Sequence, residues 1–84
     1  MEESLQVNGH QMEIHASIWN GSEVVKYDGA VVSKKKNYRT FTSFHSFQVN
    51  ESGETIVYEV EIVGGLMGFA YAVRRNGIIQ AHKP

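Results

Sequence analysis

Hydrophobic and polar positions alternate with a period of two in several short stretches of this chain. Between residues 55 and 63, Ile56, Tyr58, Val60 and Ile62 alternate with Thr55, Val57, Glu59 and Glu61. A period of two places successive side chains on opposite faces of a strand, so this stretch predicts a half-buried β-strand. No stretch of ten or more residues has a 3.6-residue period with capping residues, and we expect no helix.

Dipeptides suited to tight turns separate the alternating stretches: Asn8-Gly9, Asn20-Gly21, Asp28-Gly29 and Asn76-Gly77. Asn, Asp and Gly tolerate the positive φ that both central positions of a type I′ hairpin turn require. Pairing about the first three turns collects one apolar set on a single face: Leu5, Val7, Met12, Ile14, Ala16, Ile18, Val25, Tyr27 and Val32. A slip of one residue would scatter this set over both faces, so the first half predicts an antiparallel meander.

The turns also predict individual pairs. Folding about Asn20-Gly21 sets Ala16 opposite Val25, and folding about Asp28-Gly29 sets Glu23 opposite Lys34 at an exposed rim.

In the second half, residues 50–54 (NESGE) predict a loop. Residues 64–68 (GGLMG) predict a glycine-rich bend that lets the chain cross between sheets. About eight short strands joined by tight hairpin turns are typical of a small antiparallel β-sandwich, and we expect one all-β domain over residues 1–84. The sequence shows no internal repeat.

Composition places the chain in a broad class. Its 84 residues suit one domain, and its formal net charge of −1 gives no overall attraction to nucleic acid or to an anionic membrane. It has no cysteine, it begins with an acidic segment, and no apolar run approaches the roughly 18–20 residues of a membrane helix. We therefore expect a soluble cytoplasmic protein with no disulfides and no membrane contact.

Four segments resemble the β-domain of the Fas apoptotic inhibitory molecule family. They are SEVVKYDGAVVSKKK (22–36), FQV (47–49), GFAY (68–71) and NG (76–77), and the resemblance covers roughly residues 12–80. It implies an all-β sandwich that has no enzymatic activity and that works through protein contacts. The animal family is linked to death-receptor signalling and to restraining protein aggregation.

The stretch Ser33–Phe47 combines basic and aromatic residues. Lys34, Lys35, Lys36 and Arg39 are interleaved with the rings of Tyr38 and Phe41. Single-strand nucleic-acid binders use such charges for phosphates and such rings for base stacking. Four rings, those of Tyr38, Phe41, Phe44 and Phe47, recur every third residue, so they cannot all lie on one face of a strand. Some must turn inward, most simply Phe47. Lysines also protect edge strands from aggregation, so a solvated edge with buried aromatics is the favoured interpretation.

Two further sites have apolar candidates for binding. Trp19 lies beside the predicted turn at Asn20-Gly21, on the face opposite Ile14. It is a binding anchor if that face is exposed and a core residue if a second sheet covers it, and burial is the commoner case in so small a domain. Leu66 and Met67 lie at the tip of a glycine-flanked loop, either tucked under it or offered to a partner.

Metal and catalytic signals are weak. The histidines, His10, His15, His45 and His82, form no His-x-His pair, and a zinc site needs three or four converging ligands. No serine lies in a Gly-x-Ser-x-Gly elbow, and Glu59 and Glu61 are better explained as a solvated strand face. The GGLMG loop lacks the helix and the Lys-Ser/Thr of a phosphate-binding loop. We expect no cofactor, no metal, no catalytic residue and no enzymatic activity.

The sequence thus predicts a non-catalytic protein-interaction module that binds a partner or itself through a β-surface or edge. The candidate binding residues are Trp19, Lys34, Lys35, Lys36, Tyr38, Arg39, Leu66 and Met67. The mechanism would be edge pairing or a hydrophobic anchor with a basic rim. Basic Lys34–Arg39 and acidic Glu51–Glu61 also leave head-to-tail self-association open. The alternative is single-stranded nucleic-acid binding through Ser33–Phe47.

Overall fold

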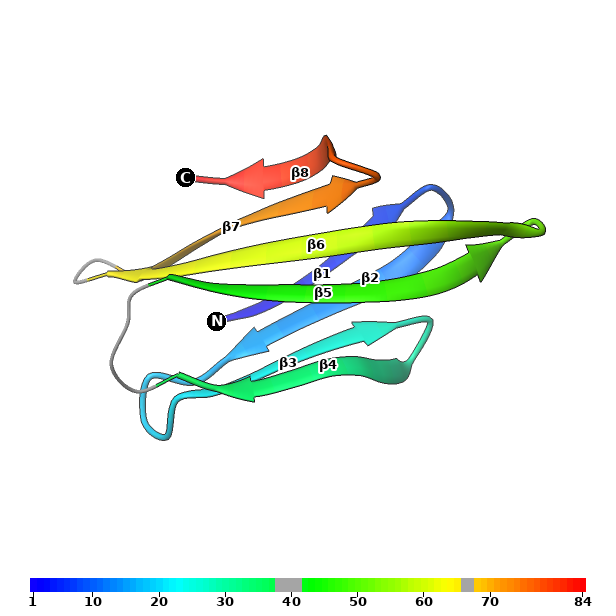
Figure 1. The fold of residues 1–84 in the computed structure, drawn as a ribbon. Coiled ribbons are helices and arrows are strands. Elements are labelled where there is room, and N and C mark those ends of the chain that lie inside the picture. The colour runs from blue at the N-terminus through cyan, green and yellow to red at the C-terminus, as the bar shows by residue number, and fades with distance from the viewer. Residues whose placement is uncertain (38–41, 66–67) are drawn as a thin grey trace. The chain divides into compact units, whose positions relative to one another are not determined.

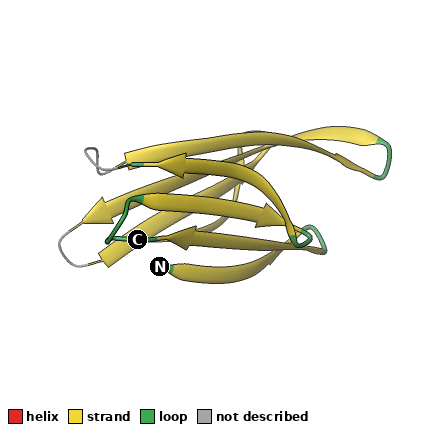
Figure 2. Ribbon diagram, turned by 90° about the horizontal axis from the view of Figure 1, so that it is seen from below, coloured by secondary structure: helices red, strands yellow, loops and turns green. Residues whose placement is uncertain are grey.

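Eight strands make up nearly all of the computed structural model, which describes residues 1–37, 42–65 and 68–84 (Figure 1). Their bounds are β1 (Glu2–Val7), β2 (His10–Ala16), β3 (Ser22–Tyr27), β4 (Ala30–Lys36), β5 (Thr42–Glu51), β6 (Glu54–Gly65), β7 (Gly68–Arg75) and β8 (Ile78–Lys83). Figure 2 shows no helix in this part of the chain, and hence none able to span a membrane. The structure confirms the predicted fold class: all-β and antiparallel, with eight strands joined largely by tight turns, as a small β-sandwich requires.

The chain divides into two compact units, Met1–Thr40 and Phe41–Pro84, and each is described by itself. Each unit holds one four-stranded antiparallel sheet, in the order β1-β2-β3-β4 in the first and β5-β6-β7-β8 in the second. Consecutive strands are neighbours throughout, so both sheets are meanders, as expected for the first half. A single domain over 1–84 stays a prediction.

The Asn8-Gly9 turn has the predicted geometry. Leu5 lies opposite Met12 and Val7 opposite His10, and the turn residues have φ of 51° and 79°. The two-residue turn at Asn8-Gly9 therefore sets the register of β1 against β2.

The Asn20-Gly21 prediction is wrong. Ala16 lies opposite Glu23 rather than Val25, and a five-residue loop, 17–21, joins β2 to β3. Only Gly21 has a positive φ, because the Asn20 side chain instead accepts a hydrogen bond from the Ser22 backbone N–H at 2.9 Å. The register shift is two residues, an even number, so the faces of both strands are unchanged.

The register predicted for the Asp28-Gly29 hairpin is correct next to the turn and wrong further along the strands. Tyr27 lies opposite Ala30 as predicted, but a β-bulge between Val25 and Lys26 then displaces the register. Lys35 rather than Lys34 therefore lies opposite Glu23, and Glu23 is buried rather than at an exposed rim.

Six of the nine residues predicted for the core face of the first unit are buried: Val7, Met12, Ile14, Ala16, Val25 and Tyr27. Leu5 and Val32 are half-buried. Ile18 is exposed, because it lies in the loop 17–21 instead of continuing β2.

Two expectations for the second unit are corrected. The segment NESGE is a two-residue hairpin turn, with Ser52 and Gly53 at φ of 51° and 85° and Glu51 opposite Glu54. The segment GGLMG does not cross between sheets, since β6 and β7 are neighbours in one sheet and Gly65 lies opposite Gly68. Serine favours a positive φ less than Asn or Asp does, so the Ser52-Gly53 turn has no strong signal in the sequence.

The two sheets repeat one structural plan although their sequences do not. The first residue of the turn before the last strand is Asp28 in one unit and Asn76 in the other, each with φ of 49°. Each donates its backbone N–H to a carbonyl two strands back, of Gln11 or Val57, at 2.8 Å. Each side chain also accepts the N–H of that same residue, at 3.0 Å and 2.9 Å. The turn residue therefore ties three strands together in both sheets.

The Ser52-Gly53 turn generates a prediction about stability. Asn accepts a positive φ more readily than Ser, so Ser52→Asn should raise the free energy of unfolding by about 0.5 kcal/mol, as measured by urea denaturation. The control, Ser4→Asn, lies at an exposed strand position of the other sheet without positive φ and should give no gain. Equal effects of the two substitutions would contradict this account of the turn.

Candidate interaction surface

The loop 17–21 is closed by hydrogen bonds from both of its ends. The Ser17 N–H donates to the Ser22 carbonyl at 2.9 Å, and the Gly21 N–H donates to the Ser17 carbonyl at 3.1 Å. The Ser17 hydroxyl accepts the Trp19 N–H at 3.2 Å. Backbone groups at the loop ends are thus satisfied within the loop, which can hold a defined shape without burying its side chains.

Trp19 and Ile18 at the top of this loop are strongly exposed, 91% and 73% respectively. Of the two alternatives that the sequence left open for Trp19, burial, the commoner case, is therefore wrong. Trp19 is exposed because it lies in the loop 17–21 and not in β2 or β3, so it is part of neither face of the sheet. The binding-anchor interpretation of Trp19 requires this exposure.

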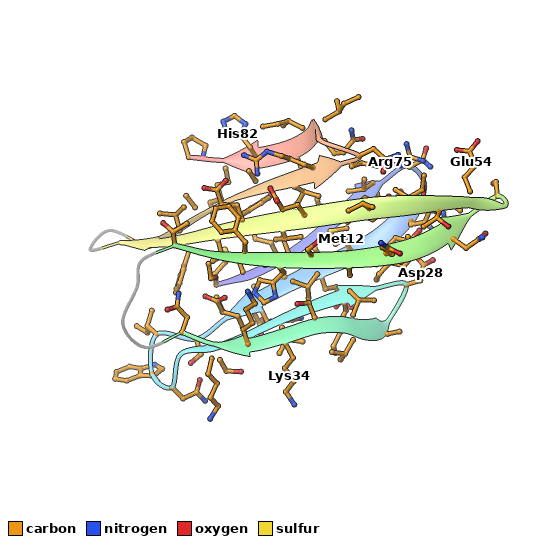
Figure 3. All side chains as sticks on the ribbon, viewed as in Figure 1. Met12, Asp28, Lys34, Glu54, Arg75 and His82 are labelled. Atoms are coloured by element: carbon orange, nitrogen blue, oxygen red, sulfur yellow. The ribbon has the colours of Figure 1, made fainter. Side chains whose placement is uncertain are left out.

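Lys34, Lys35 and Lys36 end the edge strand β4, and all three are exposed. The predicted edge position is confirmed. Lys34 and Lys36 lie on one face, opposite Val24 and Ser22, whereas Lys35 lies on the other. Figure 3 shows the Lys34 side chain extending away from its strand.

The loop and the lysines lie at the same end of the first sheet. Lys36 lies opposite Ser22, the residue that closes the loop, and the Asn37 N–H donates to the Gly21 carbonyl at 2.8 Å. Figure 1 shows the β2–β3 loop beside the end of β4. We call this group the Trp19 surface and define it as Ile18, Trp19 and Lys34–Lys36.

Four predicted binding residues lie outside the described part of the chain: Tyr38, Arg39, Leu66 and Met67. Two other rings of the basic-aromatic stretch are described. Phe47 is buried, as predicted, and stacks on Tyr58 with ring centroids 5.4 Å apart. Phe44, on the opposite face of β5, is 49% exposed.

The histidines do not converge. As predicted, His10 and His15 lie on opposite faces of the first sheet, and His10 Nδ1 is 2.7 Å from the Asp28 carboxylate while its ring stacks on Tyr27. His45 is buried in the second unit. Within residues 1–37, 42–65 and 68–84, no three His, Asp or Glu side chains form a group able to hold a metal ion.

Glu59 and Glu61 hold Arg74 between them. The Arg74 guanidinium donates to Glu59 at 2.9 Å and to Glu61 at 3.0 Å, on the face of the second sheet that carries Phe44. The hydrogen bond to Glu61, with that to Glu59, raises the pKa of Arg74. A carboxylate pair committed to an arginine is engaged in an ion pair, which weakens any resemblance to an acid–base pair.

A buried polar cluster in the second unit was not foreseen from the sequence. The Tyr58 hydroxyl donates to the Glu51 carboxylate at 2.5 Å, and the Arg75 guanidinium donates to the other oxygen of Glu51 at 2.8 Å and 3.1 Å. Glu51 is 5% exposed and Tyr58 is fully buried. The only signal of this cluster in the sequence was Glu51, an acidic residue at a core-face position of β5. That position can be recognised only once the Ser52-Gly53 turn is known. Buried charges require such partners, so the cluster serves the fold.

Comparisons with protein-family models, with curated proteins and with solved structures find no match to this chain. The resemblance to the Fas apoptotic inhibitory molecule family therefore stays a prediction. Function must be argued from the surface that the residues themselves form.

The Tyr58–Glu51 hydrogen bond generates a prediction about pH. Burial and, next, the hydrogen bond to Glu51 raise the pKa of Tyr58 to about 12, above its ordinary value of 10.0. The folded state then holds the hydroxyl proton more tightly than the unfolded state, so its contribution is complete below pH 10 and is lost as the pH rises through about 12. Tyr58→Phe should lower the free energy of unfolding at pH 7 by about 1–2 kcal/mol and reduce the loss of stability above pH 10.

Tyr71→Phe is the matched control, because Tyr71 lies on β7 of the same sheet and is only half-buried. It should leave the alkaline loss of stability unchanged. An equal alkaline loss in wild type and Tyr58→Phe would contradict the assignment.

Proposed function

We propose that this protein is a non-catalytic interaction module that binds a protein partner through the Trp19 surface. The observation that carries the proposal is the 91% exposure of Trp19 on a hydrogen-bonded loop. Tryptophan is among the residues that contribute most to protein–protein binding energy, and a rigid loop reduces the entropy lost when it is covered.

Charge supports a partner with an acidic rim. Lys34 and Lys36, on one face of β4, place two positive charges at the end of the sheet that carries the apolar pair Ile18 and Trp19, whereas Lys35 lies on the other face opposite Glu23. No described acidic side chain forms an ion pair with Lys34. An apolar anchor within a basic rim is complementary to an apolar pocket bordered by Asp or Glu. The partner class is therefore an acidic protein surface or peptide with apolar side chains.

The nucleic-acid alternative shares these lysines but needs stacking rings beside them. Phe47 is buried against Tyr58, which removes one ring of the Ser33–Phe47 stretch from that role. Exposed Trp19 is a ring on which a base could stack, but exposed Ile18 beside it has no such role, so the apolar pair at the same end of the sheet as the lysines favours the protein partner. A non-enzymatic role through protein contacts is also what the family resemblance implies.

The test is selection of a random-peptide display library on the immobilised wild-type protein. Recovered peptides should be enriched in Asp or Glu together with apolar residues, and Trp19→Ala should weaken their Kd by about 30-fold or more. Trp19 is the chain's single tryptophan, so its fluorescence emission should shift to shorter wavelength on binding. Trp19→Ala should change the free energy of unfolding by less than about 0.5 kcal/mol, because the side chain is exposed.

Ile78→Ala is the matched control, since Ile78 is an exposed apolar residue (67%) in the other unit, and it should not affect binding. Failure to recover peptides, or peptides that bind Trp19→Ala as tightly as wild type, would refute the proposal. Tight binding of oligothymidine that falls steeply with salt and is lost in Lys34→Glu/Lys36→Glu would establish the alternative instead.

A further inference from the structure

The two described sheets have four edge strands: β1, β4, β5 and β8. An edge strand has a neighbouring strand on one side only, and proteins protect such edges from further pairing with charges, bulges or short length. Which of these edges lacks protection identifies where another strand can add.

Three of the edges are protected. The strand β1 is six residues long and begins with Glu2 and Glu3. The strand β4 ends in three lysines and carries the extra residue of a bulge, Val32. The strand β8 is six residues long, ends at Lys83, and carries the extra residue of a second bulge, Gln80.

The edge strand β5 has none of these features. It is ten residues long, and it pairs with β6 through all ten without a register shift. From Thr42 to Asn50 it contains no Asp, Glu, Lys, Arg, Gly or Pro. Among the described strands only β6 is hydrogen-bonded to it, and Figure 1 shows the two running side by side. A long, regular, uncharged edge is the type that adds a further strand.

We propose that β5 pairs antiparallel with β5 of a second copy of this chain, with Ser46 on the two-fold axis. Ser46 is the midpoint of the uncharged run Thr42–Asn50, so this register uses the whole run. It sets Phe44 opposite Gln48 of the second copy on the exposed face and His45 opposite Phe47 on the buried face. The β5-β6-β7-β8 sheets of the two copies then form one eight-stranded sheet.

Self-pairing fits this edge because a two-fold axis perpendicular to the sheet places the exposed faces of both copies on one side and their buried faces on the other. Exposed residues of one copy meet exposed residues of the other, and buried meet buried. No charge within Thr42–Asn50 faces its own copy, whereas self-pairing of β4 would bring lysines together. The remaining edge of the joined sheet, β8, is bulged, so assembly ends at the dimer.

The proposal is independent of the Trp19 surface. That surface lies in the first unit, and every residue used here lies in the second. The two can therefore fail separately.

The test is analytical ultracentrifugation of the wild-type protein from micromolar to millimolar concentration, beside Ser46→Lys. Wild type should form dimers. In Ser46→Lys two lysines meet on the axis, and the dimer Kd should rise at least about tenfold. The monomer should tolerate the change, since Ser46 is exposed and lies opposite Glu59.

Ser4→Lys is the matched control. Ser4 is an exposed serine on the edge strand β1 of the other sheet and also lies opposite a glutamate, Glu13. It should leave the dimer Kd unchanged, as should Trp19→Ala.

Ser46→Cys gives a second measurement that does not require disruption. The chain has no cysteine of its own, so the variant has one thiol per copy. Under mild oxidation Ser46→Cys should form a disulfide dimer much faster than Gln48→Cys, because only residue 46 meets itself.

Four results would overturn the proposal. The first is a wild type that stays monomeric at millimolar concentration. The second is a dimer that Ser46→Lys leaves intact. The third is a disulfide that forms no faster at residue 46 than at residue 48. The fourth is β5 amides whose hydrogen exchange slows only when an extended peptide is added, which would make a foreign strand the occupant.

Discussion

A positive φ at one or two turn residues controls where each strand of this protein ends and, through the register, which side chains are buried. At Asn8, Asp28, Ser52 and Asn76 the backbone takes the left-handed conformation, and a two-residue turn follows. Because side chains alternate along a strand, moving a turn by one residue would exchange the buried and exposed faces. Asp28 and Asn76 add a second restraint, since their side chains bond to the strand beyond the one they join. The core of each sheet thus depends on a few backbone conformations at its turns.

Sequence reasoning succeeded where the turn residue identifies the conformation and failed where another interaction competes. Asn8-Gly9 and Asn76-Gly77 give the expected hairpins. At Asn20 the side chain accepts a hydrogen bond from Ser22, and the same Asn-Gly pair ends a five-residue loop instead. The bulges leave no residue signature, because Val32 and Gln80 are ordinary strand residues. The class of the fold follows from the period of two, whereas loop length and bulges depend on which of several nearly equal hydrogen-bonding patterns prevails.

The same competition between hydrogen-bonding patterns decides the geometry of the proposed binding surface. Had β2 and β3 continued to a two-residue turn, Ile18 would have stayed on the core face and Trp19 would have belonged to a strand. The longer loop removes both side chains from the sheet and lies at the same end of the sheet as the lysines of β4. The position of the lysine run at a sheet edge was predictable from the sequence. That these lysines lie next to the loop 17–21 was not, because it depends on the register between β3 and β4. Trp19 and Lys34–Lys36 were therefore candidates from the sequence, whereas Ile18 and the geometry of the surface were not.

Edge protection by charge is selective, and this selectivity connects the fold to the proposed partner. Lysines at the end of β4 oppose pairing with a second β4, because the same charges would meet, yet they favour an acidic strand or surface. The strand β5 has no such charge to select against its own copy. Under the two proposals, the edge of the first sheet opposes pairing with its own copy and favours an acidic partner, whereas the edge of the second sheet pairs with its own copy. If β4 were also uncharged and regular, each copy could pair through both of its sheets and assembly would continue without end. Under the proposed pairing, the lysines of β4 and the bulge of β8 oppose further pairing, so assembly closes at the dimer.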